Sequence, residues 1–360
     1  MNTKNTSILF EPVEFCGIRL KNRFVRSATM ENLASAHRGP SKDMISLYED
    51  LANGGVGLII SSAVRADRTW DPHAGSKGLI LDRDDIVPSF KEMIEQVHQA
   101  GSRIAVQLGS FFRYMNKAAI PYAKEPNEHM HMLTVEDIHQ IVERFGEAGE
   151  RSRKAGFDAL QINSAHGFPL SQFLSPCYNL RQDEYGGSTE NRARILSEIT
   201  AKIKQQAGDN FPVFVKMNVV DFCDGGIDIE EAVRIVEVLA TGGLAAVEAS
   251  GGGIGHNMTW LGPAKKKEWK EGYLREYAAD LKSKISVPLI MVGGLRDYSM
   301  AEEIIKNNEA DLISMSRPFI REPGLIKRWE DGDRRAATCI SCNGCMELFK
   351  ENRRVRCVNL

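Results

Sequence analysis

Short apolar runs alternate along the chain with longer stretches in which apolar residues recur at helical spacing. The apolar runs are nearly continuous and rich in β-branched residues, which is typical of parallel strands buried on both faces. Several longer stretches end in glycine, as at Gln99–Gly101 and Lys154–Gly156, and this is a signal for a helix end. The predicted strands are Arg23–Ala28, Val56–Ala63, Arg103–Leu108, Ala159–Asn163, Val213–Asn218, Ala245–Ser250, Pro288–Val292 and Leu312–Met315. The predicted helices include Ser89–Ala100, Val135–Ala155 and Ile229–Ala240.

Strands interleaved with helices in this number predict an α/β fold, a (β/α)8 TIM barrel. A doubly wound open sheet is the alternative, but it would more naturally carry a G-x-G-x-x-G turn after the first strand, and none is present there. No linker rich in Pro, Gly or Ser divides the chain. We therefore expect a barrel over residues 1–335 and a short C-terminal cysteine-rich extension, residues 336–360, packed on it.

The bulk composition narrows the class of protein. A hydrophobic content of 42% in 360 residues is ample for a buried core. The net charge of −2 and the pI near 6.5 argue against a nucleic-acid partner, which requires a basic surface. No apolar run has transmembrane length, and the N-terminus lacks a signal-peptide pattern. We expect a cytoplasmic protein with no membrane partner, in which Cys16, Cys177 and Cys223 are ordinary small buried residues.

Four cysteines near the C-terminus have a C-x2-C-x2-C-x11-C spacing: Cys339, Cys342, Cys345 and Cys357. Three cysteines within seven residues cannot form a disulfide framework without leaving an odd thiol. Four thiolates suit either a [4Fe–4S] cluster or a structural zinc ion. Zinc sites more often have two C-x2-C pairs separated by a longer stretch, so the tight first three ligands favour the cluster. Zinc and unligated thiols are the alternatives.

Two loops carry the residues expected to bind a phosphate. In a TIM barrel the loops after strands seven and eight often bind phosphate groups. Here these loops contain Gly293 and Gly294, which allow close approach of the backbone, and Arg317, which supplies positive charge. The alternative is that the paired glycines only turn the chain.

Two polar residues at strand ends suit the ring of a flavin. Gln107 ends the third strand, and its carboxamide can donate and accept at the edge of a flavin pyrimidine ring. Lys216 ends the fifth strand, and a cation there would stabilise an anionic reduced flavin. The alternative role for Lys216 is a salt bridge to a neighbouring carboxylate such as Asp221.

Three further residues are candidates for catalysis. Asn163 and His166 lie three residues apart at the end of the fourth strand, where both can donate hydrogen bonds to a substrate carbonyl and polarise it. His256 follows the sixth strand in a glycine-rich loop and could deliver a proton. The alternative is a flexible loop in which this histidine is incidental.

Taken together, these segments resemble the old yellow enzyme (NADH:flavin oxidoreductase) superfamily of FMN-dependent barrels. The resemblance covers nearly the whole chain, and it rests on LKNRFVRSAT, GGVGLIISSAV, AVQLG, QFLSP…RQDEYGGSTENRAR, MVGGLRD, DLISMSRPFI and the cysteine cluster. The cluster is similar to that of the 2,4-dienoyl-CoA reductase and trimethylamine dehydrogenase branch. In that branch FMN exchanges electrons with a [4Fe–4S] cluster and then with a C-terminal nucleotide-binding region.

The resemblance implies a role for each matching position. The implied cofactor-binding residues are Ser27, Ala28, Thr29, Ala63, Gln107, Lys216, Gly293, Gly294, Ser316 and Arg317. Among them Lys216 takes the place of the usual arginine near flavin N1. Asn163 and His166 match the pair that binds the substrate carbonyl. His256 lies where the dienoyl reductase keeps a proton-donating histidine.

Some positions depart from the family pattern. The tyrosine that follows the carbonyl-binding pair is Phe168 here, and a phenyl ring cannot donate a proton. His256, Tyr178 or Tyr114 would then donate it, or the reaction differs. Phe111 and Phe112 stand where the family has H-x-G-R, which would reshape the pocket. The FAD- and NAD-binding region of the long relatives has no counterpart in these residues.

These features predict an FMN-dependent oxidoreductase that reduces a carbon–carbon double bond conjugated to a carbonyl or thioester. The cluster would receive single electrons from an electron-transfer protein or separate subunit; the alternative is direct reduction of FMN by NADH or NADPH. A second prediction is amine oxidation or demethylation, for which an aromatic bowl would hold a cationic amine. A third is an electron-transfer subunit without its own substrate. For the amine reaction, the residues available to form the aromatic bowl are Phe111, Phe112, Phe168 and Trp260. The sequence is also compatible with a homo-oligomer.

Overall fold

The computed structural model describes residues 7–66, 78–109, 133–253, 258–259, 262–263 and 270–359. Within these residues, eight parallel strands form a closed barrel, because the first of them, β3, pairs both with the last and with β4. The barrel strands are β3 (Phe24–Arg26), β4 (Leu58–Arg65), β6 (Arg103–Gly109), β7 (Ala159–Ser164), β8 (Val213–Val220), β9 (Ala246–Gly251), β12 (Leu289–Met291) and β13 (Leu312–Met315). Each of them overlaps a predicted strand, so the predicted TIM barrel is confirmed.

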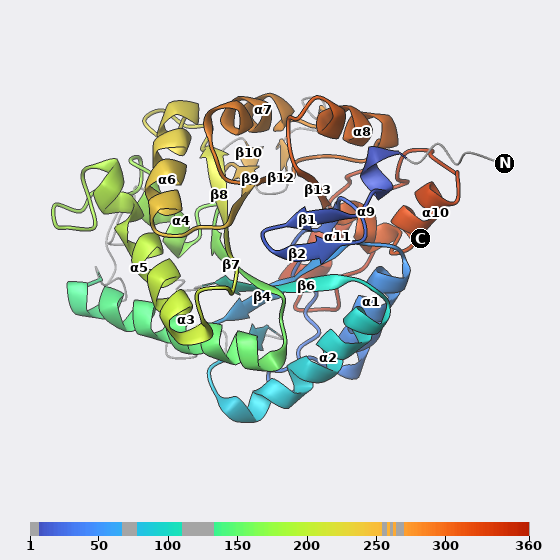
Figure 1. Cartoon of the computed structure of the whole chain (residues 1–360), viewed down its shortest axis with the longest axis horizontal. Helices are drawn as coiled ribbons and strands as arrows, with labels where there is room; N and C mark the ends of the chain where they lie inside the picture. The colour runs from blue at the N-terminus through green and yellow to red at the C-terminus, as the bar shows by residue number, and fades with distance from the viewer. Residues whose placement is uncertain are drawn as a thin grey trace.

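Helices surround the strands as an outer ring (Figure 1). Polar residues at their starts explain where several begin. The longest helix, α3, starts with a capping box between Thr134 and Asp137 and ends at Gly156, whose φ of 98° favours glycine. The helices that cover the barrel are α1 (Lys42–Asn53), α2 (Val87–Gln99), α3 (Val135–Ala155), α5 (Thr189–Ala207), α6 (Ile229–Thr241), α7 (Arg275–Lys284) and α8 (Tyr298–Lys306). The shorter helices are η1 (Ile8–Phe10), η2 (Asp84–Ile86), α4 (Pro169–Leu174), α9 (Arg317–Arg321), α10 (Leu325–Glu330) and α11 (Gly344–Lys350).

A β-hairpin closes the N-terminal end of the barrel. Strands β1 (Val13–Phe15) and β2 (Ile18–Leu20) pair antiparallel and lie across the ring of strands in Figure 1. The ring of Phe15 packs edge-on against Phe214 of β8, with the centroids 5.6 Å apart. The hairpin therefore seals one end of the barrel with apolar side chains and leaves the other end for a site. The remaining short strands are β5 (Leu79–Ile80), β10 (Met258–Thr259) and β11 (Gly262–Pro263).

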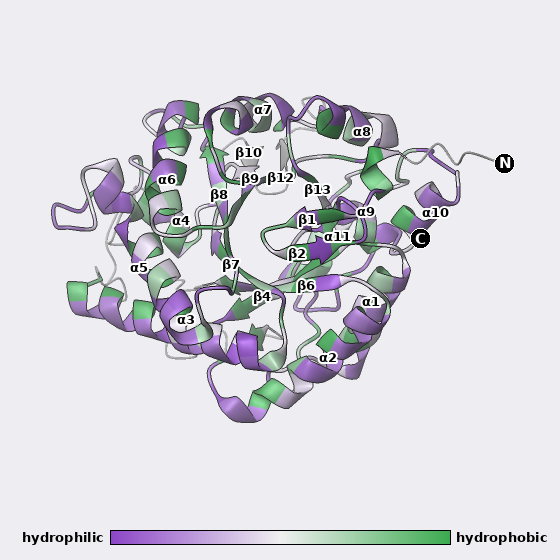
Figure 2. Ribbon diagram, in the orientation of Figure 1, coloured by the Kyte–Doolittle hydropathy of each residue, from purple (hydrophilic) through white to green (hydrophobic). Residues whose placement is uncertain are grey.

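Hydropathy is distributed as a TIM barrel requires. In Figure 2 the barrel strands are mostly hydrophobic, and the surrounding helices carry both hydrophobic and hydrophilic residues. Residues of β4 are buried along its whole length, since they face either the barrel interior or the helices. No helix in the described ranges is long and apolar enough to cross a membrane.

The prediction that three scattered cysteines are buried is wrong. Cys16, Cys177 and Cys223 are free thiols of intermediate exposure. Cys177 and Cys223 follow the C-terminal ends of β7 and β8, and their sulfur atoms lie 3.3 Å apart. Their contact joins two loops at the same end of the barrel, which the spacing of 46 residues in sequence did not reveal.

The C-terminal extension packs on the barrel through hydrogen bonds made at several points. The side chain of Asn32 donates to the carbonyls of Phe349 and Arg353, each at 3.2 Å. The backbone N–H of Val355 donates to the carbonyl of Glu31 at 3.0 Å. The guanidinium of Arg296 donates to the carbonyl of Cys339 at 2.9 Å. These bonds fix the cysteine-rich segment over the end of the barrel opposite the hairpin.

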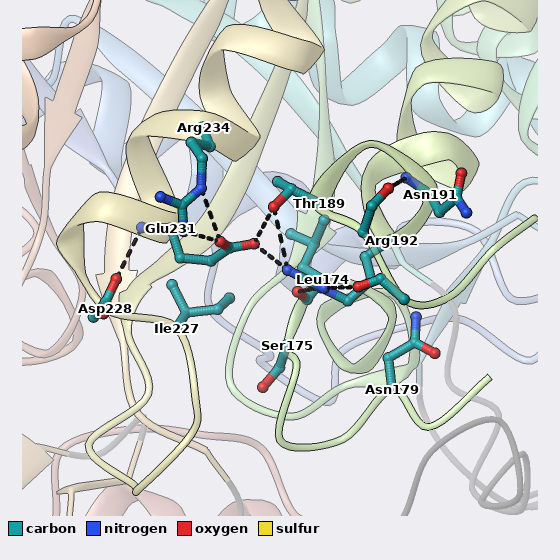
Figure 3. Close-up of polar contacts among 12 residues, drawn as sticks. Leu174, Ser175, Asn179, Thr189, Asn191, Arg192, Ile227, Asp228, Glu231 and Arg234 are labelled. Carbon is teal, nitrogen blue, oxygen red and sulfur yellow. Dashed lines mark hydrogen bonds and ion pairs between the residues drawn. The ribbon is translucent and has the colours of Figure 1, made fainter. Parts of the chain in front are cut away.

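The segment that carries YGGSTENR has a structural role. Arg192 of α5 pairs with Glu231 of α6, and the two side chains are only 8% and 7% exposed (Figure 3). Arg192 also donates to the carbonyl of Leu174 at 3.0 Å, and the Thr189 hydroxyl donates to Glu231 at 2.8 Å. These bonds hold the long β7–α5 loop against α6.

Replacing Arg192 by Met should lower the free energy of unfolding by about 3 kcal/mol, because Glu231 would lose its buried partner. Burial alone raises the pKa of Glu231, but hydrogen bonds from Arg234 and Thr189 and the charge of Arg192 hold it below its usual value. The stabilisation is therefore present at neutral pH and lost as the pH falls below the usual carboxyl range. Urea denaturation at pH 7 measures the effect. The matched control is Arg234→Met, whose side chain is 55% exposed and should cost about 1 kcal/mol or less. Equal costs for the two variants would contradict this account.

Candidate functional site

A cavity open to solvent lies at the C-terminal ends of the barrel strands. This is the end at which TIM barrels hold their active sites. All the predicted site residues on the barrel except His256 line it: Ser27, Ala28, Thr29, Ala63, Gln107, Asn163, His166, Lys216, Gly293, Gly294, Ser316 and Arg317. His256 lies outside the described residues.

The residues that the sequence predicts at a phosphate lie together in the cavity wall. Gly293 and Gly294 follow β12 with φ values of 135° and 74°, a backbone shape that side chains disfavour. A Cβ atom on Gly293 would lie 2.9 Å from Leu274, so a larger residue does not fit there. The hydroxyls of Thr29 and Ser316, which also line the cavity, hydrogen-bond each other at 2.7 Å. The two glycines and the two hydroxyl-bearing residues therefore line one cavity.

Arg317 provides the positive charge among the residues predicted at a phosphate. It begins α9 directly after Ser316 and lines the cavity. Its guanidinium donates to the side-chain oxygen of Asn343 in the cysteine-rich extension at 2.6 Å. That bond holds the arginine in one orientation and ties this part of the cavity wall to the extension.

The cavity wall also carries the two polar residues that the sequence predicts at a flavin ring, Gln107 and Lys216. Gln107 is 3% exposed and donates through Nε2 to Oε1 of Gln161 at 2.7 Å. Lys216 is 6% exposed and donates to the Ser27 hydroxyl at 2.9 Å. Its carboxylate partner is Glu248 of β9, with an N–O distance of 3.4 Å.

Asp221, the carboxylate considered as the alternative partner of Lys216, serves another purpose. It accepts hydrogen bonds from the Ser175 hydroxyl at 2.6 Å and from the Asn218 amide at 2.7 Å. Asn218 in turn accepts from the backbone N–H of His166 at 3.0 Å. Asp221 thus supports the loop that carries His166.

Asn163 and His166 face the cavity side by side with Lys216. Asn163 pairs in register with Lys216 across β7 and β8, and its buried Oδ1 atom has no hydrogen-bond partner. Since the O and N atoms of the Asn163 amide can exchange places, this position offers a ligand either an acceptor or a donor.

His166 has a φ of 63°, and its Nε2 lies 2.6 Å from the Ser250 hydroxyl. Burial, followed by the charge of Lys216, lowers the pKa of His166 well below its usual value. Its neutral ring can still donate one hydrogen bond.

The structure changes the set of candidate proton donors. Phe168 lines the same cavity as Asn163 and His166, and its ring has no hydroxyl that could donate a proton. Tyr178 is 5% exposed and is not part of the cavity wall, and Tyr114 lies outside the described residues. Tyr273, which was not predicted, lines the cavity. Burial raises the pKa of its phenol against the opposing charge of Arg317, so it is protonated at neutral pH.

The cysteine-rich extension contributes to the same cavity, which was not predicted from the sequence. Its contributing residues are Ser341, Met346, Phe349 and Val355. All four cysteines of the extension line a second, smaller cavity. Arg317, Ile320 and Ser341 line both cavities, so one layer of side chains separates them.

Polar groups approach the cysteine sulfurs. Arg321 donates to Sγ of Cys357 at 3.3 Å, and the Asn359 amide donates to Sγ of Cys342 at 3.1 Å. Burial raises the pKa of the Cys345 thiol against the opposing charge of Arg317, and Cys339 and Cys342 raise it further. In the part of the chain that the structure describes, no three His, Cys, Asp or Glu side chains are grouped closely enough to hold a metal ion.

Comparison with protein families decides the identity of the barrel. The model of the NADH:flavin oxidoreductase / NADH oxidase family matches residues 8–335. The chain belongs to this family. FMN and a nicotinamide nucleotide fit this family, so the resemblance inferred from sequence is confirmed.

Individual relatives extend beyond the chain. It is 32% identical over 363 residues to an NADH oxidase of Thermoanaerobacter brockii, a match that covers 97% of this chain and 55% of the relative. It is 28% identical to a cinnamate reductase of Clostridium sporogenes, covering 97% and 57%. The solved structure of histamine dehydrogenase from Rhizobium sp. 4-9 has a TM-score of 0.84 and 26% identity, covering 97% and 52%. The chain spans about half the length of each of these proteins.

The residues in the cavity fit FMN on their own chemistry. The glycine pair and Arg317 suit a phosphate, because backbone amides and a guanidinium are strong donors to phosphate oxygens. The amide of Gln107 retains its Oε1 and one N–H for a ligand after donating to Gln161. The buried Oδ1 of Asn163 has no hydrogen-bond partner in the protein, so a bound polar group would supply the missing hydrogen bond.

Replacing Arg317 by Ala should raise the dissociation constant for FMN by about 10- to 100-fold, the usual cost of losing charge-assisted bonds to phosphate. Quenching of flavin fluorescence on binding to apoprotein measures it. Arg317→Lys should recover part of the affinity, because lysine keeps the positive charge but lacks the planar set of N–H donors of a guanidinium. The exposed Arg335 is the control, and Arg335→Ala should leave the constant unchanged. Unchanged affinity in Arg317→Ala would remove this residue from the phosphate site.

Proposed function

We propose that this protein is an FMN-dependent oxidoreductase that reduces a carbon–carbon double bond conjugated to a carbonyl or thioester. We further propose that Cys339, Cys342, Cys345 and Cys357 hold a [4Fe–4S] cluster through which the electrons pass. The observation that carries both proposals is the pair of adjoining cavities. One has the residues for a flavin and a carbonyl, the other has four cysteines, and Arg317, Ile320 and Ser341 separate them.

In this proposal the barrel, residues 1–335, binds FMN, and its wall residues bind and orient the substrate. Bound FMN supplies hydride chemistry. Asn163 and His166 donate to the carbonyl oxygen and stabilise the negative charge that develops there. His166 stays neutral over the physiological range because its pKa is low, so it acts as a hydrogen-bond donor rather than as an acid.

A proton must also reach the substrate carbon next to the carbonyl. His256 is the candidate from the sequence, and Tyr273 is the candidate from the structure. Among the described residues that line the cavity, Tyr273 has the one phenol, and its raised pKa keeps the proton in place until transfer. Phe168 stands where the family usually has a tyrosine, and it cannot donate a proton. His256 or Tyr273 would therefore take over proton donation.

Residues 336–360 would bind the cluster. All four cysteines line the second cavity, and four thiolates are the ligand set of such a cluster. Four thiolates also suit tetrahedral zinc, and the tight spacing of the first three cysteines favours the cluster. The N–H donors from Arg321 and Asn359 also suit a cluster, since hydrogen bonds to sulfur tune cluster potentials.

The source of electrons separates two forms of the proposal. In the first form, an electron-transfer protein or subunit would supply single electrons to the cluster. Arg317, Ile320 and Ser341, the side chains between the two cavities, would then lie between the cluster and FMN. Alternatively, NADH or NADPH would reduce FMN directly at the cavity mouth. Full turnover with a nicotinamide alone, at a rate unaffected by loss of the cluster, would defeat the first form.

Amine oxidation is the second candidate function. The structure of histamine dehydrogenase, at 26% identity, supports it, as does the aromatic ring of Phe168 in the cavity wall. Phe111, Phe112 and Trp260, the other rings considered for an amine bowl, lie outside the described residues.

A substrate panel distinguishes the two functions. The anaerobic protein is given 2-enoates and enoyl thioesters with a reductant, and separately secondary and tertiary amines with an electron acceptor. We expect turnover of the conjugated alkenes and none of the amines. Turnover of amines alone would replace the proposed reaction, and turnover of neither would favour an electron-transfer subunit.

A further inference from the structure

Glu248 is a fully buried carboxylate directly behind the residues that face the flavin site. It lies in β9 and has no exposed surface. Its Oε1 accepts from the hydroxyls of Ser27 at 2.7 Å and Ser314 at 2.8 Å. Its Oε2 accepts from Nε2 of Gln161 at 2.9 Å and lies 3.4 Å from Nζ of Lys216. Both oxygens of this carboxylate are therefore occupied as hydrogen-bond acceptors inside the barrel.

This carboxylate fixes the direction of a chain of amides. Because Oε2 of Glu248 is the acceptor at this contact, Gln161 turns its NH2 group toward Glu248. The Oε1 of Gln161 then points to Gln107 and accepts from its Nε2 at 2.7 Å. Gln107 is left with a defined arrangement, Oε1 and one N–H, for the cavity. The orientation of an amide that lines the cavity is therefore set from two residues away.

The same carboxylate offsets the charge of Lys216. The ammonium donates to the Ser27 hydroxyl, which donates to Glu248, so the two charges are linked both directly and through Ser27. A lysine with a buried anion behind it presents a weaker positive potential to the cavity than a lysine alone. This pairing reduces the stabilisation that Lys216 can give to negative charge on a bound flavin.

We propose that Glu248 is a positioning residue that lowers the reduction potential of the flavin and orients Gln107 toward it. The proposal rests on the proposed FMN site. It predicts that a neutral residue at position 248 makes the flavin easier to reduce, because the charge of Lys216 is no longer offset. It also predicts that breaking the amide chain weakens FMN binding without any change in the residues that touch the cofactor.

The test is spectroelectrochemical titration of the full chain with bound FMN, carried out between pH 6 and 8. In Glu248→Gln the ratio of reduced to oxidised flavin at a fixed potential should rise about tenfold, which corresponds to a shift of about +30 mV for a two-electron couple. The matched control is Asp311→Asn. It also removes a carboxylate paired with a lysine, Lys282 at 2.6 Å, but at the opposite end of the barrel. Its potential should equal that of the wild type.

A second variant keeps the proposal testable if Glu248→Gln does not fold. Gln161 does not line the cavity, so any effect of Gln161→Met on the flavin must pass through Glu248 and Gln107. This variant should raise the FMN dissociation constant several-fold and lower the potential, because Glu248 loses a donor but keeps its charge. An unchanged potential and an unchanged FMN affinity in the variants that fold would overturn this inference alone. A wild-type protein that binds no flavin would overturn the proposed function itself.

Discussion

Replacing His166 by Ala should lower kcat/KM for a carbonyl-conjugated alkene by about 10²- to 10³-fold, the usual cost of removing one donor to a developing oxyanion. The imidazole lines the cavity beside Asn163, and its backbone N–H is fixed by Asn218. Because burial and Lys216 keep its pKa far below the ordinary value, the ring is neutral from pH 7 to pH 9. The loss of activity should therefore be constant over that range. Steady-state kinetics at several pH values measures it.

The control for this variant is another half-buried histidine that also has a polar partner. His98 of α2 lies 2.8 Å from the carboxylate of Asp158, away from the cavity. His98→Ala should leave kcat/KM unchanged. Both proteins should retain bound FMN, which separates loss of catalysis from loss of the cofactor. A His166→Ala variant within about threefold of the wild type would show that this residue does not polarise the substrate.

Replacing Cys345 by Ser should abolish iron binding, because a serine hydroxyl is a hard ligand that replaces the most buried thiolate of the set. The variant should lose its iron, its acid-labile sulfide and the broad absorbance of a cluster, while retaining FMN. Turnover supported by a one-electron donor should fall to background. Metal analysis by mass spectrometry together with the visible spectrum measures these changes.

Cys177→Ser is the matched control for this experiment. Cys177 is also a free thiol near another cysteine, but it faces Cys223 and not the second cavity. Its substitution should leave the iron content unchanged. Equal iron in Cys345→Ser and the wild type, or stoichiometric zinc in the wild type, would remove the cluster from the account.

The barrel could be predicted from the sequence because its signals are local. Continuous apolar runs such as Val213–Asn218 and glycine after a helix, as at Gly156, each mark one element without knowledge of the others. The cavity residues at the strand ends followed directly, since the C-terminal ends of parallel strands converge at one end of a barrel. The same reasoning predicts that Gln107, Asn163 and Lys216 lie together, and all three line the cavity.

Contacts between distant segments could not be predicted in the same way. Glu248 occupies one position of an apolar strand, and only closure of the barrel brings it to Lys216 and Gln161. The extension covers the cavity through bonds such as Asn32 to Phe349, which span most of the chain. A buried charged residue inside a strand was the one signal available, because such residues require a partner.

The measurement that tests the central claim most directly is an analysis of protein purified without oxygen. Flavin, iron and sulfide are quantified, and the visible spectrum is recorded during titration with NADH, NADPH and then dithionite. The account predicts about one FMN and about four iron atoms per chain, with a broad cluster absorbance beneath the flavin bands that dithionite bleaches. Flavin without iron, fully bleached by a nicotinamide alone, would contradict it and leave a barrel reductase whose cysteines carry no electrons.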